Sequence, residues 1–133
     1  GLKRLNSDVD GVFNLPNRVT SIGTAAFEYC YGLTSIDIPS GVTSISDSIF
    51  FGCRNLANVT IPSGVTNIYG NAFRQCYNLT SVTVNATMPP TLGNDVFLHT
   101  SSNMVIYVPA ESVNAYKQAS GWSDFSSRIQ AIP

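Results

Sequence analysis

Three cysteines are the residues of this chain best suited to chemistry, because thiolates bind soft metal ions and act as nucleophiles. Cys30, Cys53 and Cys76 follow one another at intervals of 23 residues, and no CxxC pair or nearby histidine accompanies them. Tetrahedral metal binding needs ligands that converge on one point, whereas equivalent positions of a repeat project in parallel. The same parallel directions would strain a disulfide, and the odd number would leave one thiol over. We therefore predict buried thiols that pack as small apolar side chains, and no metal site.

His99 is the one histidine of the sequence, so a serine or cysteine nucleophile would depend on it as general base. It aligns with Gln75 of the preceding unit, outside the apolar positions, which predicts an exposed side chain. Among the acidic residues, Asp37, Asp47 and Asp95 fall in different units and form no repeated pair of the kind that glycoside hydrolysis requires. We therefore predict no catalytic residues and no cofactor.

The apolar residues share the interval of the cysteines, which indicates an internal repeat. Residues 33–45 align with residues 56–68 with the apolar positions matched, and the last unit follows at an interval of 24, with one residue inserted around 88–90. Each recurring position should form a ladder of like side chains in the core. The ladders are Leu15, Ile38, Ile61 and Val84; Val19, Val42 and Val65; Ile22, Ile45 and Ile68; and Phe27, Phe50, Phe73 and Phe97.

Alternating apolar and polar residues predict one half-buried strand in each unit. Five such segments, at 12–16, 35–39, 58–62, 81–85 and 104–109, should stack about 4.8 Å apart into a parallel sheet. Pro39 and Pro62 end two of these strands, and a second short extended piece is expected at 42–45. The segment before each cysteine suits one helical or 3-10 turn that presses phenylalanine inward, so we predict an aromatic spine.

The last 24 residues, 110–133, have the pattern of a helical cap. We predict a helix over 110–120, stopped at Gly121, and a second short helix with Ser123 as its N-cap. Together these helices should cover the last coil and its sheet edge. The apolar residues assigned to this role are Val113, Tyr116, Ala119, Trp122, Phe125, Ile129 and Ile132.

The pattern L-x-x-I-x-I-P-x-x-V-T-x-I-x-x-x-A-F-x-x-C runs over 33–53 and 56–76 with one apolar exchange in each, Ile49 for the alanine and Val59 for the first isoleucine. It resembles the BspA-like bacterial leucine-rich-repeat family, and residues 107–116, 121–123 and 128–129 resemble the C-terminal unit of such proteins. The chain departs from the pattern at Thr100, in place of the cysteine, and at Asn103, in place of the leucine. The resemblance implies an α/β fold: a right-handed leucine-rich-repeat solenoid with a parallel β-sheet ladder, short helical or 3-10 turns on the other side and a C-terminal helical cap. We divide the chain into an incomplete leading unit (1–11), the repeats (12–109) and the cap (110–133).

The amino-acid composition limits the kinds of molecule that this chain is expected to bind. The chain is 44% hydrophobic and 11% charged with a net charge of -1, and its basic residues form no cluster, so we do not expect nucleic acid or anionic membranes as partners. No apolar stretch approaches the roughly 20 residues of a membrane helix, which predicts no membrane insertion. The family resemblance implies a secreted or cell-surface protein that adheres to proteins or glycans of the host matrix or of another cell.

The outward side of the predicted sheet is our candidate binding surface, because solenoids usually bind there. If Ile36 and Ile38 face the core, the residues beside them face out. We first expect an adhesion module that uses this face or the loops beside it; the alternative is a structural spacer or terminal cap without a ligand of its own. The candidate ligand-binding residues are Asn14, Ser35, Asp37, Asn58, Thr60, Ser81, Thr83 and Tyr107, in columns that also hold Val12 and Val105.

Overall fold

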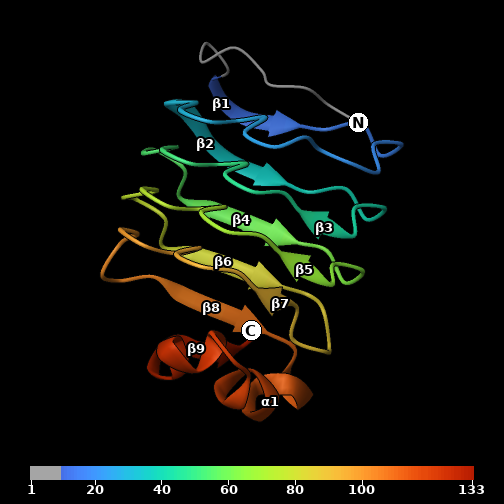
Figure 1. Cartoon of the computed structure of the whole chain (residues 1–133), viewed down its shortest axis with the longest axis vertical. Helices are drawn as coiled ribbons and strands as arrows, with labels where there is room; N and C mark the ends of the chain where they lie inside the picture. The colour runs from blue at the N-terminus through green and yellow to red at the C-terminus, as the bar shows by residue number, and fades with distance from the viewer. Residues whose placement is uncertain (1–9) are drawn as a thin grey trace.

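The computed structural model describes residues 10–133 and arranges them as coils stacked along one axis, with the cap at the C-terminal end (Figure 1). The predicted parallel ladder is confirmed as a six-stranded sheet with the order β1-β2-β4-β6-β8-β9. Its strands are β1 Asp10–Asn14, β2 Gly32–Asp37, β4 Asn58–Ile61, β6 Ser81–Val84, β8 Val105–Val108 and β9 Ile129–Ala131. The predicted leading unit lies outside the described residues except at positions 10 and 11, where β1 begins.

Parallel pairing in this sheet places equivalent residues of successive coils side by side. Ile36 pairs with Val59, Val59 with Val82, and Val82 with Ile106, and all four side chains are buried. The residues that alternate with them point away from the core. A single coil would leave this apolar face exposed to water, so stacking is what stabilises each strand.

The second extended piece of each coil forms a smaller sheet. Its strands are β3 Ser44–Ile45, β5 Asn67–Ile68 and β7 Thr91–Leu92, paired in parallel in the order β3-β5-β7. Ile45 and Ile68 are adjacent in this ladder and buried, as the repeat predicts. The core therefore lies between two ladders of unequal length.

The remaining side of each coil is made of turns, and no helix occurs in the part of the chain from residue 10 to residue 109. Some backbone amides in these turns donate to the carbonyl three residues earlier, as in a 3-10 turn. Residues with left-handed backbone conformation, four positions apart in each turn, prevent a longer 3-10 helix. In the first coil these are Ala25 and Tyr29, each with φ 59°. The amide between them, that of Phe27, donates to Ile49 O of the next coil at 2.9 Å. The predicted turns are thus single turns, and the intervening amides join the coils.

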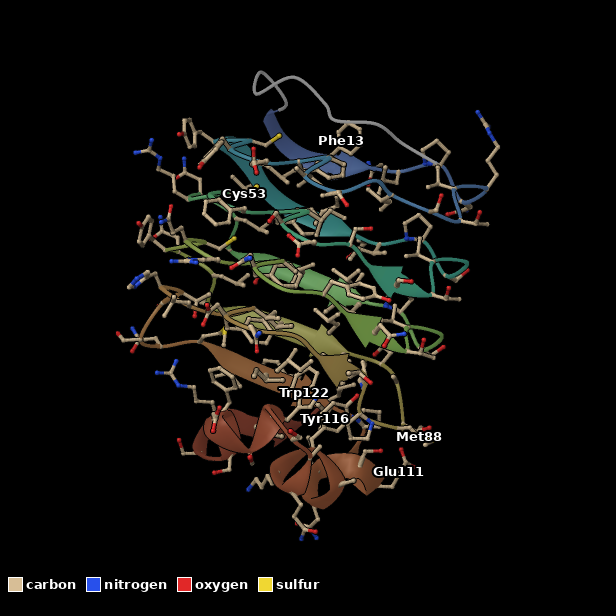
Figure 2. The ribbon with its side chains drawn as sticks, viewed as in Figure 1. Phe13, Cys53, Met88, Glu111, Tyr116 and Trp122 are labelled. Atoms are coloured by element: carbon tan, nitrogen blue, oxygen red, sulfur yellow. The ribbon has the colours of Figure 1, made fainter. Side chains whose placement is uncertain are left out.

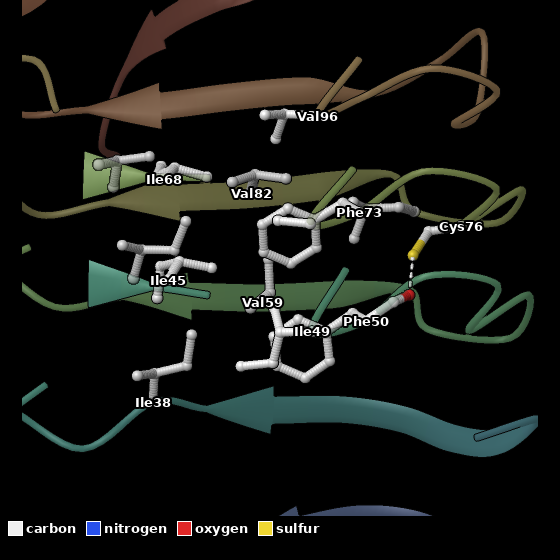
Figure 3. Packing of buried hydrophobic residues seen from close by; sticks show 14 of the residues in the cluster. Ile38, Ile45, Ile49, Phe50, Val59, Ile68, Phe73, Cys76, Val82 and Val96 are labelled. Atoms are coloured by element: carbon white, nitrogen blue, oxygen red, sulfur yellow. Dashed lines mark hydrogen bonds between the residues drawn. The ribbon is translucent and has the colours of Figure 1, made fainter. Parts of the chain in front are cut away.

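The predicted aromatic spine is confirmed. Phe27, Phe50, Phe73 and Phe97 stack face to face along the solenoid, with ring centroids 5.3, 5.3 and 5.7 Å apart. Figure 3 shows Phe50 and Phe73 one above the other beside the column of Val59 and Val82. The spine fills the space between the turns and the six-stranded sheet, and it gives each coil a flat contact with the next.

The cap differs from the prediction in its second half. The helix expected over 110–120 is a 3-10 turn, η1 Ala110–Ser112, followed by α1 Val113–Gln118. The predicted second short helix is present as the 3-10 segment η2 Trp122–Arg128, which is kinked at Phe125. Its N-cap is Gly121, so the prediction of Ser123 as the N-cap is wrong. The η2 segment leads into β9, in which Ile129 pairs with Ile106 of β8. A strand satisfies the backbone groups along the edge of β8, which a helix could not do.

Side-chain donors of the cap bond backbone carbonyls of the last coil, which a further coil would otherwise bond. Tyr116 Oη donates to Ala86 O at 2.6 Å, and Trp122 Nε1 donates to Pro90 O at 2.8 Å. Both rings are buried between the last coil and the cap (Figure 2). Ile132, which we expected to cover the core, is 37% exposed instead, because the chain has passed the end of β9. Within residues 10–133 no helix is long and apolar enough to span a membrane.

Candidate functional site

The outward columns of the six-stranded sheet lie where the sequence predicts them. Val12, Ser35, Asn58, Ser81 and Val105 form one continuous row of paired residues. A second row contains Asn14, Asp37, Thr60, Thr83 and Tyr107, and it continues into Gln130 of the cap. We call these two rows the strand face. All eight candidate ligand-binding residues therefore share one surface, and whether they bind anything stays a prediction.

The strand face is polar and nearly uncharged. Its side chains are exposed or half-buried, with Asp37 as the single carboxylate in the two rows. Small hydroxyl and amide groups dominate, and Val12, 65% exposed, and Tyr107 are the larger apolar surfaces at opposite ends. Such a surface offers hydrogen bonds along its length and few anchors for a buried hot spot.

The three cysteines are buried thiols, as predicted, and two of them have a role that the sequence did not suggest. Cys53 Sγ donates to Phe27 O at 2.9 Å, and Cys76 Sγ donates to Phe50 O at 3.1 Å (Figure 3). Each thiol thus joins its coil to the preceding one. Burial raises the pKa of Cys53 to about 12 and that of Cys76 well above its usual range, so both remain protonated at neutral pH. Among the described residues no cluster of His, Cys, Asp and Glu is suited to a metal ion.

His99 is exposed, as predicted, in a left-handed position at the rim of a hollow between the last repeat and the cap. Asp95, Ser120 and Asp124 line the same hollow, which measures about 450 Å³. Within the described part of the chain no hydrogen bond joins His99 to any of them. The hollow therefore contains titratable groups but no nucleophile held against a base.

A second polar and aromatic surface lies on the turns that lead into the strands, on the left in Figure 1. We call it the tyrosine–arginine ridge. Its core is a column at the interval of the repeat, Tyr31, Arg54 and Tyr77. The Arg54 guanidinium carbon lies 4.0 Å from the centroid of the Tyr31 ring, a cation–π contact. A hollow of about 190 Å³ opens between these residues, and it is also lined by Tyr29, Gly52 and Gln75.

The backbone of the ridge is held by asparagines of the following coils. Asn55 Nδ2 donates to Tyr31 O at 2.6 Å, and Asn78 Nδ2 donates to Arg54 O at 2.8 Å. Gly52 has φ 74°, and a Cβ atom there would overlap the ring of Tyr29. The glycine therefore provides the space in which that ring lies across the turn. These contacts fix the ridge before any ligand arrives.

Sequence reasoning missed the ridge, although a signal was present. Tyr31, Arg54 and Tyr77 each follow a cysteine of the repeat directly. The core columns repeat like apolar residues, whereas this column mixes aromatic and cationic side chains. Bulky Tyr and Arg at a repeated surface position are the residue types enriched in binding hot spots.

A family model described as BspA type leucine rich repeat region matches residues 11–119 in six copies. A comparison with curated proteins found no match.

The solved structures that are similar to this chain include two of bacterial proteins. A leucine-rich repeat protein from Bacteroides ovatus ATCC 8483 is 29% identical, with a TM-score of 0.62 over 74% of this chain and 30% of its own. A leucine rich cell surface protein from Faecalibacterium prausnitzii A2-165 is 22% identical, with a TM-score of 0.56 over 97% of this chain and 38% of its own. The likeness to the second concerns the fold alone, and this chain spans well under half the length of either protein.

Proposed function

Because this chain belongs to the BspA-type leucine-rich-repeat family, we propose that it is a non-enzymatic binding module of a secreted or surface-displayed bacterial protein. In this proposal the strand face contacts a protein or a glycan on host matrix or on another cell. The repeat fold is generally non-enzymatic, and one similar structure belongs to a protein described as a leucine rich cell surface protein. Both points support the proposal.

The observation that carries the proposal is the continuity of the strand face. Six strands in register give five intervals of about 4.8 Å, so the face is about 24 Å long. An extended partner segment of about seven residues would span it at about 3.3 Å per residue. Exposed side chains such as Asp37 and Asn58 could hydrogen-bond such a segment, and the face has no other evident role in holding the core.

The test is binding of the immobilised chain to a panel of purified extracellular-matrix proteins and glycans. A variant with Asp37→Arg and Thr83→Arg places two bulky cations on alternate rungs of the strand face. Its matched control, Asp47→Arg with Ser63→Arg, changes the charge equally on exposed turns away from that face. We expect the unchanged chain to bind saturably. The affinity of the strand-face variant should be at least tenfold lower, and that of the control variant should be unchanged.

Two outcomes would contradict the proposal. Binding that the strand-face variant retains while remaining folded would place the contact elsewhere on the molecule. The absence of saturable binding to every member of the panel would favour the alternative, a structural spacer or terminal cap of a longer surface protein. Circular dichroism and urea unfolding of each variant separate loss of contact from loss of fold.

A further inference from the structure

The hollow in the tyrosine–arginine ridge is lined by three exposed tyrosine rings, and ring contacts hold two of them, Tyr29 and Tyr31, in place. Tyr29, Tyr31 and Tyr77 are 38%, 41% and 53% exposed, which is unusual for such large rings beside a packed core. Tyr29 meets Phe51 edge to face with centroids 5.6 Å apart, and Gly52 leaves space for its ring. Rings fixed in this way lose little conformational entropy when a ligand stacks on them.

The hollow also has a cation without a counterion. Arg54 is exposed, lies over the ring of Tyr31 and forms no ion pair with the residues that the structure describes. Glu28, the acidic residue in these turns, forms no ion pair with Arg54 within 4 Å. A guanidinium is a planar fork that matches the two oxygens of a carboxylate.

We propose that this hollow binds a carboxylate-bearing sugar, such as a uronic or sialic acid unit of a glycan. The ring C–H groups of the sugar stack on the tyrosine faces, whose π-electrons attract them. Its carboxylate accepts hydrogen bonds from Arg54, and the Gln75 amide and the tyrosine hydroxyls meet its hydroxyl groups. The inference concerns a surface separate from the strand face, so it does not depend on the proposed partner there.

Size and lining favour a sugar over a peptide. At about 190 Å³ the hollow has the volume of roughly six water molecules, enough for one ring and too small for an extended chain. The hollow is open and carries guanidinium, amide and hydroxyl groups among its rings, which suit the many hydroxyl groups of a sugar. An acidic peptide therefore serves as the competing ligand in the test.

The experiment is a titration of the ¹⁵N-labelled chain, followed by amide chemical shifts. The probes are 3′-sialyllactose and a glucuronate-containing tetrasaccharide, with lactose as the neutral sugar and a tetraglutamate peptide as the acidic non-sugar. We expect saturable shifts in the turns at 28–31, 51–54 and 74–77 with at least one acidic sugar. Lactose and the peptide should bind at least tenfold more weakly, and added salt should weaken the acidic sugar.

Three variants test the assigned contacts. Arg54→Gln should weaken the acidic sugar about tenfold and leave lactose unaffected, because it removes the charge and retains a polar side chain. Tyr77→Ala should weaken both sugars. Arg18→Gln removes an exposed cation in another part of the first coils and should change nothing.

Several results would overturn the inference. They are shifts that do not saturate, equal affinity for lactose and the acidic sugars, tighter binding of the peptide, and equal effects of Arg54→Gln and Arg18→Gln. The strand-face variant with Asp37→Arg and Thr83→Arg should bind the acidic sugar as the unchanged chain does. Loss of sugar binding in that variant would contradict the separation of the two surfaces, whereas failure of the matrix panel alone would leave this inference standing.

Discussion

Truncating Phe50, an inner ring of the aromatic spine, should destabilise the fold more than truncating Phe13, which lies beside the first ring of the spine. Phe50 is fully buried and stacks on a ring on each side, with centroids 5.3 Å away in both directions. Replacing a buried Phe by Ala costs about 3–5 kcal/mol, and here one cavity weakens two coil interfaces, so we expect about 4–5 kcal/mol. With a urea dependence of about 2 kcal/mol per molar, the unfolding midpoint should fall by about 2 M.

Two variants control for this reasoning. Phe13 is half-buried at the first coil and meets Phe27 edge to face at 5.6 Å, so Phe13→Ala should cost about 1–2 kcal/mol. Phe50→Leu keeps most of the side chain but loses the stacked faces, and it should cost about 1–2 kcal/mol. Equal losses for Phe50→Ala and Phe13→Ala, or a loss below about 1.5 kcal/mol for Phe50→Ala, would refute a spine that couples the coils.

Three further predictions concern the thiols, the cap and the turns. Because burial raises the pKa of Cys53 from 9.0 to about 12, the folded chain retains a proton that the unfolded chain releases, and unfolding free energy should fall as pH rises from 9 towards 12. A flat profile in urea unfolding, or no difference from Cys53→Ser, would contradict this. Tyr116→Phe removes a buried donor to the last coil and should cost about 1–2 kcal/mol, and an unchanged urea midpoint would argue against that bond. Gly93→Ala brings a Cβ to 2.7 Å from Gly70 N and should lower the free energy of unfolding by about 1–3 kcal/mol. At Gly64 the nearest atom is 3.9 Å from an added Cβ, so Gly64→Ala should leave the thermal midpoint unchanged. Equal thermal midpoints for the two variants would contradict this reasoning.

The core of this fold was predictable because every coil meets the same environment. A position such as Ile38 or Phe50 is enclosed by equivalent positions above and below it, so burial imposes the same residue type at each interval. The outward columns follow from the same pleat, which is why Asp37 and Thr60 lie on one face as predicted. Periodicity therefore carries information both about the core and about the surface beside it.

Features at the ends of the solenoid, and positions whose neighbours in adjacent coils are a different residue type, were not predictable from the repeat. Residues 129–131 form β9 because the edge of β8 needs backbone partners, and three residues carry too little pattern to announce a strand. The left-handed turn positions include Ala25 and Tyr29 as well as Gly52, so a column of glycines does not mark them. At Asn103, where the repeat has leucine, the neighbouring Met104 is buried instead. Its flexible side chain fits the changed spacing of the last unit.

The claim that the strand face is a binding surface is tested most directly by mapping a bound partner. The ¹⁵N-labelled chain would be titrated with the first matrix protein fragment or glycan that binds saturably, and the shifted amides assigned. We expect the largest shifts to cluster in β2, β4, β6 and β8, around Asp37, Asn58 and Thr83. Shifts confined to the short sheet β3-β5-β7 or to the turns that follow the strands would contradict it.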